Sequence, residues 1–293
     1  MIQCKQTHTY KRAGGLGIEA DVYMCPDGGL RPVVVWIHGG ALIMGHREDL
    51  APWQRDLYLA AGHHVVSIDY RLAPETKLPG IVEDLQDACR WVREAGPALL
   101  RAAAERMAVV GHSAGGYLAL MSGSSVQPRP SAVVSFYGYG DIAGDWYGRP
   151  DPFYCQQPMV SAEEAWASVG QTPLSGTRES EKRDRFYLYC RQQGLWPKLV
   201  SGQDPHVESE ALTSFCPARN VTPRHPPTLL LHGDEDSDVP YEQSVMMVAA
   251  LSAAGVEHAL ITIPGGGHGF DAANDSVAAG AFERALAFLR AHL

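Results

Sequence analysis

The chain has 293 residues, of which 45% are hydrophobic, enough for one large domain with a substantial core or for two small ones. Its 24 basic and 33 acidic residues give a formal net charge of −9, which excludes the broad basic surface that nucleic-acid binding requires. No run of eighteen apolar residues occurs, so we expect no transmembrane helix and no membrane partner.

The predicted elements alternate between strands and helices along most of the chain. The first is a β-hairpin, because residues 7–24 alternate in polarity around a Gly-Gly pair. Short apolar runs then predict buried strands over 32–40, 63–70, 106–113, 131–138, 227–234 and 257–265. Amphipathic patterns predict helices over 79–96, 240–255 and 275–293. This order predicts an α/β fold: a mostly parallel sheet with an antiparallel start, covered by helices on both faces.

One segment, residues 139–226, interrupts this alternation. It shows no strong strand and holds eleven of the 25 aromatic residues. A connection of that length inside a compact domain is usually functional. We therefore predict an inserted cap of helices and loops over 139–226, on a core formed by 1–138 and 227–293; a surface excursion without a role at the site is the alternative. The candidates for substrate contact in this segment are Trp146, Trp166 and Trp196.

The serine in "GHSAGG" (111–116) is the strongest functional signal. Ser113 lies between Gly111 and Gly115, after the apolar run "MAVV" and before the helix-like run "YLALMSG". A strand that turns directly into a helix needs glycine where the two elements crowd each other, and the turn leaves the serine strained and exposed. The pattern predicts a nucleophilic serine, with a glycine-rich helix entry as the structural alternative.

A nucleophilic serine also needs hydrogen-bond donors for the oxyanion that forms when it attacks a carbonyl. The stretch "WIHGGAL" (36–42) follows the first buried parallel strand, and its glycines allow backbone N–H groups to face a pocket. The predicted donors are the N–H groups of Gly40 and Ala41. Ala114, at the N-terminus of the helix after Ser113, is the third.

The predicted general base is His268, in the glycine-rich stretch "PGGGHGF" (264–270) after the last strand. Glycines on both sides allow the imidazole ring to approach the serine closely. The other histidines show no H-x-x-H or comparable pattern, so we expect no metal site. The proposed chemistry needs no cofactor.

The acid that orients this histidine is expected in "HGDEDSDVP" (232–240). Asp234 is predicted to lie within the turn that follows the strand, and Glu235 to face away. Asp238 is predicted to cap the helix that follows. Asp236 lies between these positions, so we predict its carboxylate within about 2.6–3.2 Å of a His268 ring nitrogen.

With these motifs, the chain resembles the α/β-hydrolase superfamily, and within it the hormone-sensitive-lipase-like and bacterial feruloyl-esterase-like carboxylesterases. The resemblance runs from about residue 20 to the C-terminus apart from 139–226, and includes "DYRLAPE" (69–75). It implies that this stretch braces the oxyanion loop, and that the acid is the fourth residue after His232, which is Asp236. Ala41 and His112 stand where the lipase-like group has Gly and Asp, a departure that is more similar to the feruloyl-esterase and kynurenine-formamidase branches.

The expected activity is hydrolysis of carboxylic esters with small to medium acyl or aryl groups, through an acyl-enzyme. An amidase or formamidase would use the same triad. A ligand-binding receptor of the same fold is a third hypothesis, which the presence of His268 disfavours. The sequence leaves open whether the chain forms a homodimer.

The six cysteines and the beginning of the chain bear on its location. The cysteines are scattered without a C-x-x-C pair, which favours reduced thiols and a cytoplasmic protein, although a Cys155–Cys190 disulfide stays open. The first fifteen residues carry basic side chains with no apolar stretch behind them. We therefore expect no secretory signal.

Overall fold

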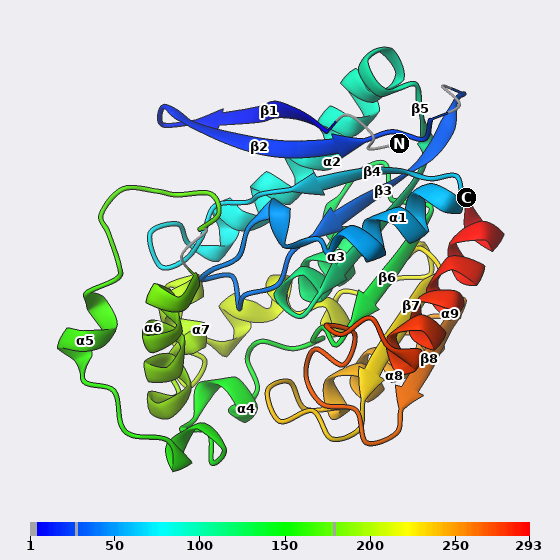
Figure 1. The fold of residues 1–293 in the computed structure, drawn as a ribbon. Helices are drawn as coiled ribbons and strands as arrows, with labels where there is room; N and C mark the ends of the chain where they lie inside the picture. Colours follow the sequence, from blue (N-terminus) through cyan, green and yellow to red (C-terminus); the bar gives the residue numbers. More distant parts are fainter. Residues whose placement is uncertain (1–4, 27–28, 178–179) are drawn as a thin grey trace.

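The computed structural model describes residues 5–26, 29–177 and 180–293. Its centre is an eight-stranded sheet in the order β1-β2-β4-β3-β5-β6-β7-β8 (Figure 1). The strands span Gln6–Ala13 (β1), Leu16–Tyr23 (β2), Arg31–Ile37 (β3), His64–Ile68 (β4), Ala102–His112 (β5), Ala132–Phe136 (β6), Thr228–Gly233 (β7) and His258–Ile263 (β8).

The sheet is mixed, as predicted from the sequence. The β1–β2 hairpin is antiparallel, and β2 pairs with β4 in the same sense. All pairs from β4 through β8 are parallel. Because parallel strands end at the same edge of a sheet, the loops after β3, β5, β7 and β8 meet there, and this edge carries every predicted catalytic residue.

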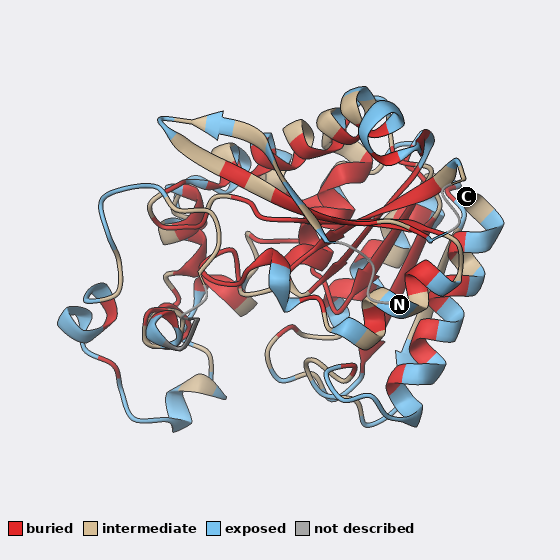
Figure 2. Ribbon diagram, turned by 45° about the horizontal axis from the view of Figure 1, so that its top comes forward, coloured by how far each residue is buried: buried red, intermediate tan, exposed pale blue. Residues whose placement is uncertain are grey.

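Helices cover both faces of the sheet, because successive side chains of the buried strands point to opposite sides. Val33 and Val35 belong to the core under α2, α3 and α8, whereas Val34 and Trp36 belong to the core under α1 and α9. Figure 2 shows the central strands buried along most of their length. The helices are Pro52–Ala60 (α1), Leu78–Leu100 (α2), Ala114–Ser125 (α3), Glu242–Ala253 (α8) and Ser276–His292 (α9).

The inserted segment connects β6 to β7 and consists of helices and loops, with no strand among its described residues. Figure 1 shows α4 to α7 gathered at the left of the view, apart from α8 and α9 at the lower right. The four helices are Asp145–Gly148 (α4), Ala162–Trp166 (α5), Ser180–Gln193 (α6) and Trp196–Ser201 (α7). Short 3-10 turns span Arg47–Asp49, Tyr154–Gln156, Ser209–Phe215 and Pro217–Arg219.

Two further expectations can be compared with the structure. Cys155 and Cys190 are both free thiols, so the disulfide between them does not form. Among the helices of the described ranges, none has the length and hydropathy that crossing a bilayer requires.

Candidate active site

Ser113 lies in a sharp turn between β5 and α3. Its backbone has φ 55° and ψ −119°, a conformation that residues other than glycine rarely adopt. A Cβ on Gly111 would lie 2.1 Å from the carbonyl oxygen of Gly115, and a Cβ on Gly115 would lie 2.1 Å from the oxygen of Ile37. Both glycines are therefore sterically required: Gly111 faces the helix that follows, as inferred from the sequence, whereas Gly115 faces the end of β3.

The structure brings Ser113, His268 and Asp236 together from three separate loops. Nε2 of His268 lies 3.0 Å from the Ser113 hydroxyl, and Nδ1 lies 2.8 Å from Oδ2 of Asp236. The distance between Asp236 and His268 lies within the range expected from the sequence, and the other ring nitrogen faces Ser113. This is the order of contacts through which a base that is oriented by a carboxylate activates a serine.

Asp236 accepts three hydrogen bonds and has one further nitrogen close by, that of His232, which also lies 3.0 Å from the Val239 carbonyl oxygen. Its Oδ1 accepts the N–H groups of Asp238 and Val239, both at 2.9 Å. Its Oδ2 is shared by His268 and by Nε2 of His232, which lies 3.2 Å away. From the sequence, His232 served only as the reference point for identifying the acid as the fourth residue after it. A fully buried histidine four residues before a carboxylate was the signal that could have identified this second partner.

The two ionisable members of the triad influence each other. Burial alone would favour the neutral form of Asp236, but hydrogen bonds from His232 and His268 hold the pKa of its carboxyl well below the usual range. Burial would also lower the pKa of His268, yet its bond to Asp236 and the negative charge of Asp238 outweigh burial and raise that pKa. Asp236 is therefore ionised over the pH range in which His268 titrates.

The loop after β3 has the geometry expected for an oxyanion hole. Gly40 and Ala41 have positive φ values of 95° and 55°, and both line the pocket beside Ser113. Within the described residues, the N–H groups of Gly40, Ala41 and Ala114 have no hydrogen-bond acceptor. A Cβ on Gly39 would lie 3.1 Å from the carbonyl oxygen of His112 and 3.3 Å from the Cβ of Ser113, so the loop passes close to the serine turn at this position.

Two side chains hold the loop after β3: Tyr70, which follows β4, and Trp196 of the inserted segment. The Tyr70 hydroxyl donates to the carbonyl oxygens of His38 and Gly39 at 3.1 and 3.2 Å, and its ring stacks on His38. The "DYRLAPE" stretch thus braces the loop. Trp196 of α7 donates from Nε1 to the carbonyl oxygen of Ala41 at 2.9 Å. Burial lowers the pKa of His38 to about 3, so that ring is neutral near pH 7.

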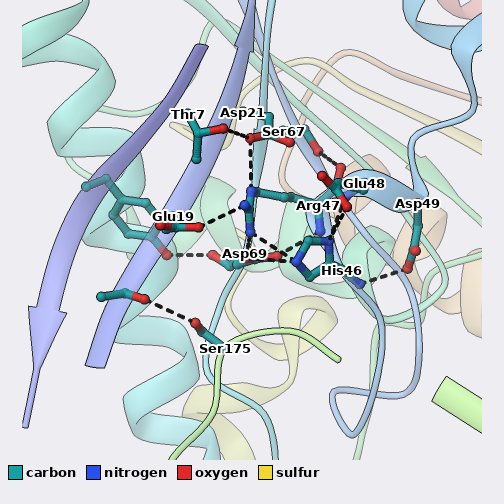
Figure 3. Close-up of polar contacts among 12 residues, drawn as sticks. Thr7, Glu19, Asp21, His46, Arg47, Glu48, Asp49, Ser67, Asp69 and Ser175 are labelled. Atoms are coloured by element: carbon teal, nitrogen blue, oxygen red, sulfur yellow. Dashed lines mark hydrogen bonds and ion pairs between the residues drawn. The ribbon is translucent and has the colours of Figure 1, made fainter. Parts of the chain in front are cut away.

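A buried charge network fixes the far end of the same loop (Figure 3). The Arg47 guanidinium contacts three carboxylates, those of Glu19, Asp21 and Asp69, on or next to β2 and β4. Ser67 of β4 donates to the Arg47 carbonyl oxygen at 2.6 Å. A buried guanidinium with several carboxylate partners holds the chain in one geometry, so the loop between β3 and α1 is tied to the sheet at both ends.

A pocket of about 460 Å³ opens at Ser113, within the size range of small-molecule sites. Its aromatic walls are Trp36, Tyr137 and Tyr187. Neither lysine nor arginine occurs among its described lining residues, whereas Asp49, Asp238 and Asp271 do; its remaining lining residues are Gly39, Gly40, Ala41, Met44, Ala51, Gln54, His112, Ser113, His268, Gly269 and Ala272.

The three tryptophans predicted to contact substrate lie outside the lining of this pocket, which corrects that expectation. Trp196 is fully buried and stacks on Tyr147. Trp146 stacks on the other side of Tyr147, and Trp166 packs against Phe186 while remaining 42% exposed. Their apolar surface stabilises the inserted segment itself, and the sequence could not show which aromatic residues face inward.

A second polar group, missed from the sequence, lies beside the nucleophile. His112, immediately before Ser113, places Nε2 3.0 Å from Oδ2 of Asp271, and the Tyr137 hydroxyl donates to Oδ1 of the same carboxylate at 2.6 Å. The Tyr137 ring packs edge-on against His268 at 4.8 Å between ring centroids. These contacts join the serine turn to the loop that carries His268. The histidine inside the serine motif was the available signal.

The other acids of the 232–240 stretch have different roles. Asp234 lies in the turn, as predicted, and its carboxylate accepts the N–H of Gly265 at 2.6 Å. Asp238 does not cap α8, which has no side-chain cap, so that prediction was wrong. Its Oδ1 instead accepts hydrogen bonds from Tyr187 and Arg191 of α6, because the inserted segment packs over this loop.

Solved structures of other proteins are similar to this chain in fold. The crystal structure of an α/β hydrolase superfamily protein from Enterococcus faecalis has a TM-score of 0.77 and 24% identity, and covers 98% of both chains. The native esterase Est2 of Thermogutta terrifontis has a TM-score of 0.69 and 20% identity, over 97% of this chain and 91% of that one. These likenesses confirm the predicted α/β-hydrolase fold.

Sequence comparison is more specific. The non-reducing polyketide synthase Preu3 of Preussia isomera is 30% identical over 97% of this chain, which spans only 13% of that synthase. The BD-FAE family model matches residues 20–251, most of the chain. The chain therefore belongs to the BD-FAE family of feruloyl-esterase-like α/β-hydrolases.

Proposed function

We propose that the protein hydrolyses carboxylic esters through a covalent acyl-enzyme on Ser113. One observation carries this proposal: a strained serine at the mouth of a pocket lies 3.0 Å from a histidine that is oriented by a buried carboxylate. Membership of a feruloyl-esterase-like family supports it. The intact His268 distinguishes this proposal from a receptor that only binds its ligand.

The proposal assigns a residue to each step of the reaction. His268 takes the Ser113 proton through Nε2 as the hydroxyl attacks the ester carbonyl. The N–H groups of Gly40, Ala41 and Ala114 hold the negative oxygen. His268 then gives the proton to the leaving alcohol. It next activates the water that hydrolyses the acyl-enzyme, while Asp236 stays ionised and keeps the ring oriented.

The lining of the pocket favours neutral substrates. Aromatic and small apolar side chains line the pocket with Ser113, and the lining also includes the carboxylates of Asp49, Asp238 and Asp271. An acyl or alcohol group that carries its own carboxylate would be repelled by these acids. A neutral acyl or aryl group of small to medium size fits the pocket volume.

Aryl esters of increasing acyl length test this proposal. We expect measurable hydrolysis of short and medium neutral acyl esters, a decline with long chains, and slow turnover of a matched ester that carries a carboxylate. The matched amide of the best acyl group should react more slowly. Faster turnover of the amide would favour an amidase, and no hydrolysis of any ester by the folded protein would contradict the proposal.

Thioesters form a second candidate class of substrate. The 30% identity to part of a polyketide synthase favours them, because polyketides are assembled as acyl thioesters. The same serine chemistry cleaves both kinds of bond. Comparing kcat/KM for an oxygen ester and a thioester of one acyl group decides between them: a ratio strongly in favour of the thioester would identify it as the preferred substrate.

The pH dependence follows from the state of the base. Only neutral His268 can accept the serine proton, and its pKa is raised above the ordinary value of about 6.5. For a neutral ester, kcat/KM should therefore fall as the pH drops through a value above 6.5, with a slope of one proton. A rate that stays constant down to about pH 5 in a folded enzyme would show that His268 is not the base.

A further inference from the structure

Asp238 lies next to the reacting nitrogen of His268. Its Oδ2 lies 3.4 Å from Nε2 of His268, the nitrogen that faces Ser113. The side chain is 17% exposed and lines the pocket. His268 therefore has one carboxylate on each side: Asp236 bonds Nδ1, and Asp238 faces Nε2.

The inserted segment fixes this second carboxylate. Tyr187 donates its hydroxyl to Oδ1 of Asp238 at 2.5 Å, and Nη1 of Arg191 donates to the same oxygen at 2.7 Å. Arg191 also donates to the Asp238 backbone carbonyl at 3.0 Å. Oδ1 is thus occupied by α6, which leaves Oδ2 to face the histidine.

Arg191 is itself held in a closed cage. Its side chain is 1% exposed and also pairs with Asp151. Its guanidinium carbon lies 4.7–5.8 Å from the centroids of four aromatic rings, those of Trp146, Tyr147, Tyr154 and Tyr187. A guanidinium within about 6 Å of aromatic faces is attracted to them, so this cage fixes Arg191 and, through it, Asp238.

We propose that Asp238 is a positioning residue through which the inserted segment stabilises the protonated form of His268 during acyl transfer. The inference rests on the proposed function. The negative charge on Asp238, whose Oδ2 lies 3.4 Å from Nε2, attracts the ring when His268 is protonated and gains little when the ring is neutral. An interaction that improves as the proton arrives stabilises the transition state more than the ground state.

Other charged and titratable side chains also lie around His268 and act on its protonation together with Asp238. Asp236 and Asp238 face the ring from the β7–α8 loop, Arg191 from α6 and Tyr137 from the stretch after β6. Asp236 contacts Nδ1, and Arg191 opposes protonation from behind Asp238. Only Asp238 presents a negative charge to Nε2 among these described neighbours, so removing that charge should act directly on the base.

The test is the Asp238→Asn variant, which keeps an oxygen acceptor for Tyr187 and Arg191 and removes the charge. An opposite charge at this distance shifts a pKa by about 1–3 units, and the positive charge of Arg191 reduces the effect. We expect the acid limb of kcat/KM to move down by about one pH unit, with a several-fold loss of rate on the plateau. Asp238→Glu should keep the limb near its wild-type position.

The matched control is Glu235→Gln, which removes one negative charge from an exposed side chain of the same loop. Its limb and rate should match the wild type. If Asp238→Asn does not fold, Asp238→Ser removes the same charge with a smaller side chain. An unmoved limb in a folded neutral variant would overturn the inference, even if the plateau rate falls.

A second readout separates this inference from the proposed function. In Ser113→Ala protein, NMR titration of the His268 ring reports its protonation without any turnover. We expect Asp238→Asn in that background to lower the His268 titration midpoint by about one pH unit. An unchanged midpoint would contradict the inference, whereas an absence of ester hydrolysis by the wild type would contradict the proposed function alone.

Discussion

Replacing Ser113 with alanine should reduce ester hydrolysis by about 10⁶-fold in turnover, the scale seen when a serine hydrolase loses its nucleophile. The only side-chain atom removed is Oγ, whose hydrogen-bond partner in the structure is Nε2 of His268. The Cβ that makes the φ of 55° unfavourable is kept, so the strain of the turn is unchanged. Hydrolysis of an aryl ester, together with a thermal melt, measures both expectations.

A serine-directed phosphonate makes this test specific. The wild-type protein should gain one covalent adduct by mass spectrometry, and Ser113→Ala should gain none. Ser124→Ala is the matched control, because Ser124 lies on the following helix and bonds only to the Met121 carbonyl oxygen within the described residues. Labelling of the Ser113→Ala protein, or loss of labelling in the control, would contradict the assignment of the nucleophile.

Replacing Asp236 with asparagine should cost on the order of 10⁴-fold in turnover, the loss seen when the triad acid of a serine hydrolase becomes an amide. The carboxylate accepts the Nδ1 proton of His268 at 2.8 Å, which leaves Nε2 free to accept the serine proton. An amide N–H at that position would favour the other tautomer, in which Nε2 carries the proton and cannot act as a base. The measurement is kcat for an aryl ester.

Two observations distinguish a loss of activity in Asp236→Asn from a loss of stability. Oδ1 of Asp236 also holds the backbone N–H groups of Asp238 and Val239, and an asparagine oxygen can keep those bonds. Asp234→Asn is the control, since Asp234 bonds Gly265 in the turn and should mainly change stability, by about 0.5–2 kcal/mol. A nearly active and folded Asp236→Asn protein would show that the acid lies elsewhere.

Local sterics explain how much of the site was predictable from the sequence. The two glycines around Ser113 are required in this turn, because a Cβ at either position would lie 2.1 Å from a backbone oxygen. Continuous apolar runs identify strands that are buried on both faces. Ser113, Asp236 and His268 can meet although they lie far apart in the chain, because successive parallel strands deliver their loops to one edge of the sheet.

The inserted segment shows where this reasoning stops. Its aromatic content predicted a cap over the substrate, and three tryptophans were assigned to the pocket. The structure packs Trp196 under the oxyanion loop and Trp146 against Arg191, and gives the pocket Tyr187 instead. An aromatic residue in an irregular segment has no periodicity that indicates its buried side, so composition alone cannot assign it.

The sequence by itself determined the sheet, the serine turn and the order of the three loops, because each depends on neighbours within a few residues or on strand order. Only the tertiary structure decided which polar groups surround the triad. Arg191 reaches Asp238 across 47 residues, and His112 reaches Asp271 from another loop. Such contacts depend on how separately formed elements pack, and the free energy of a buried charge pair is settled only when its partners are brought within hydrogen-bonding distance.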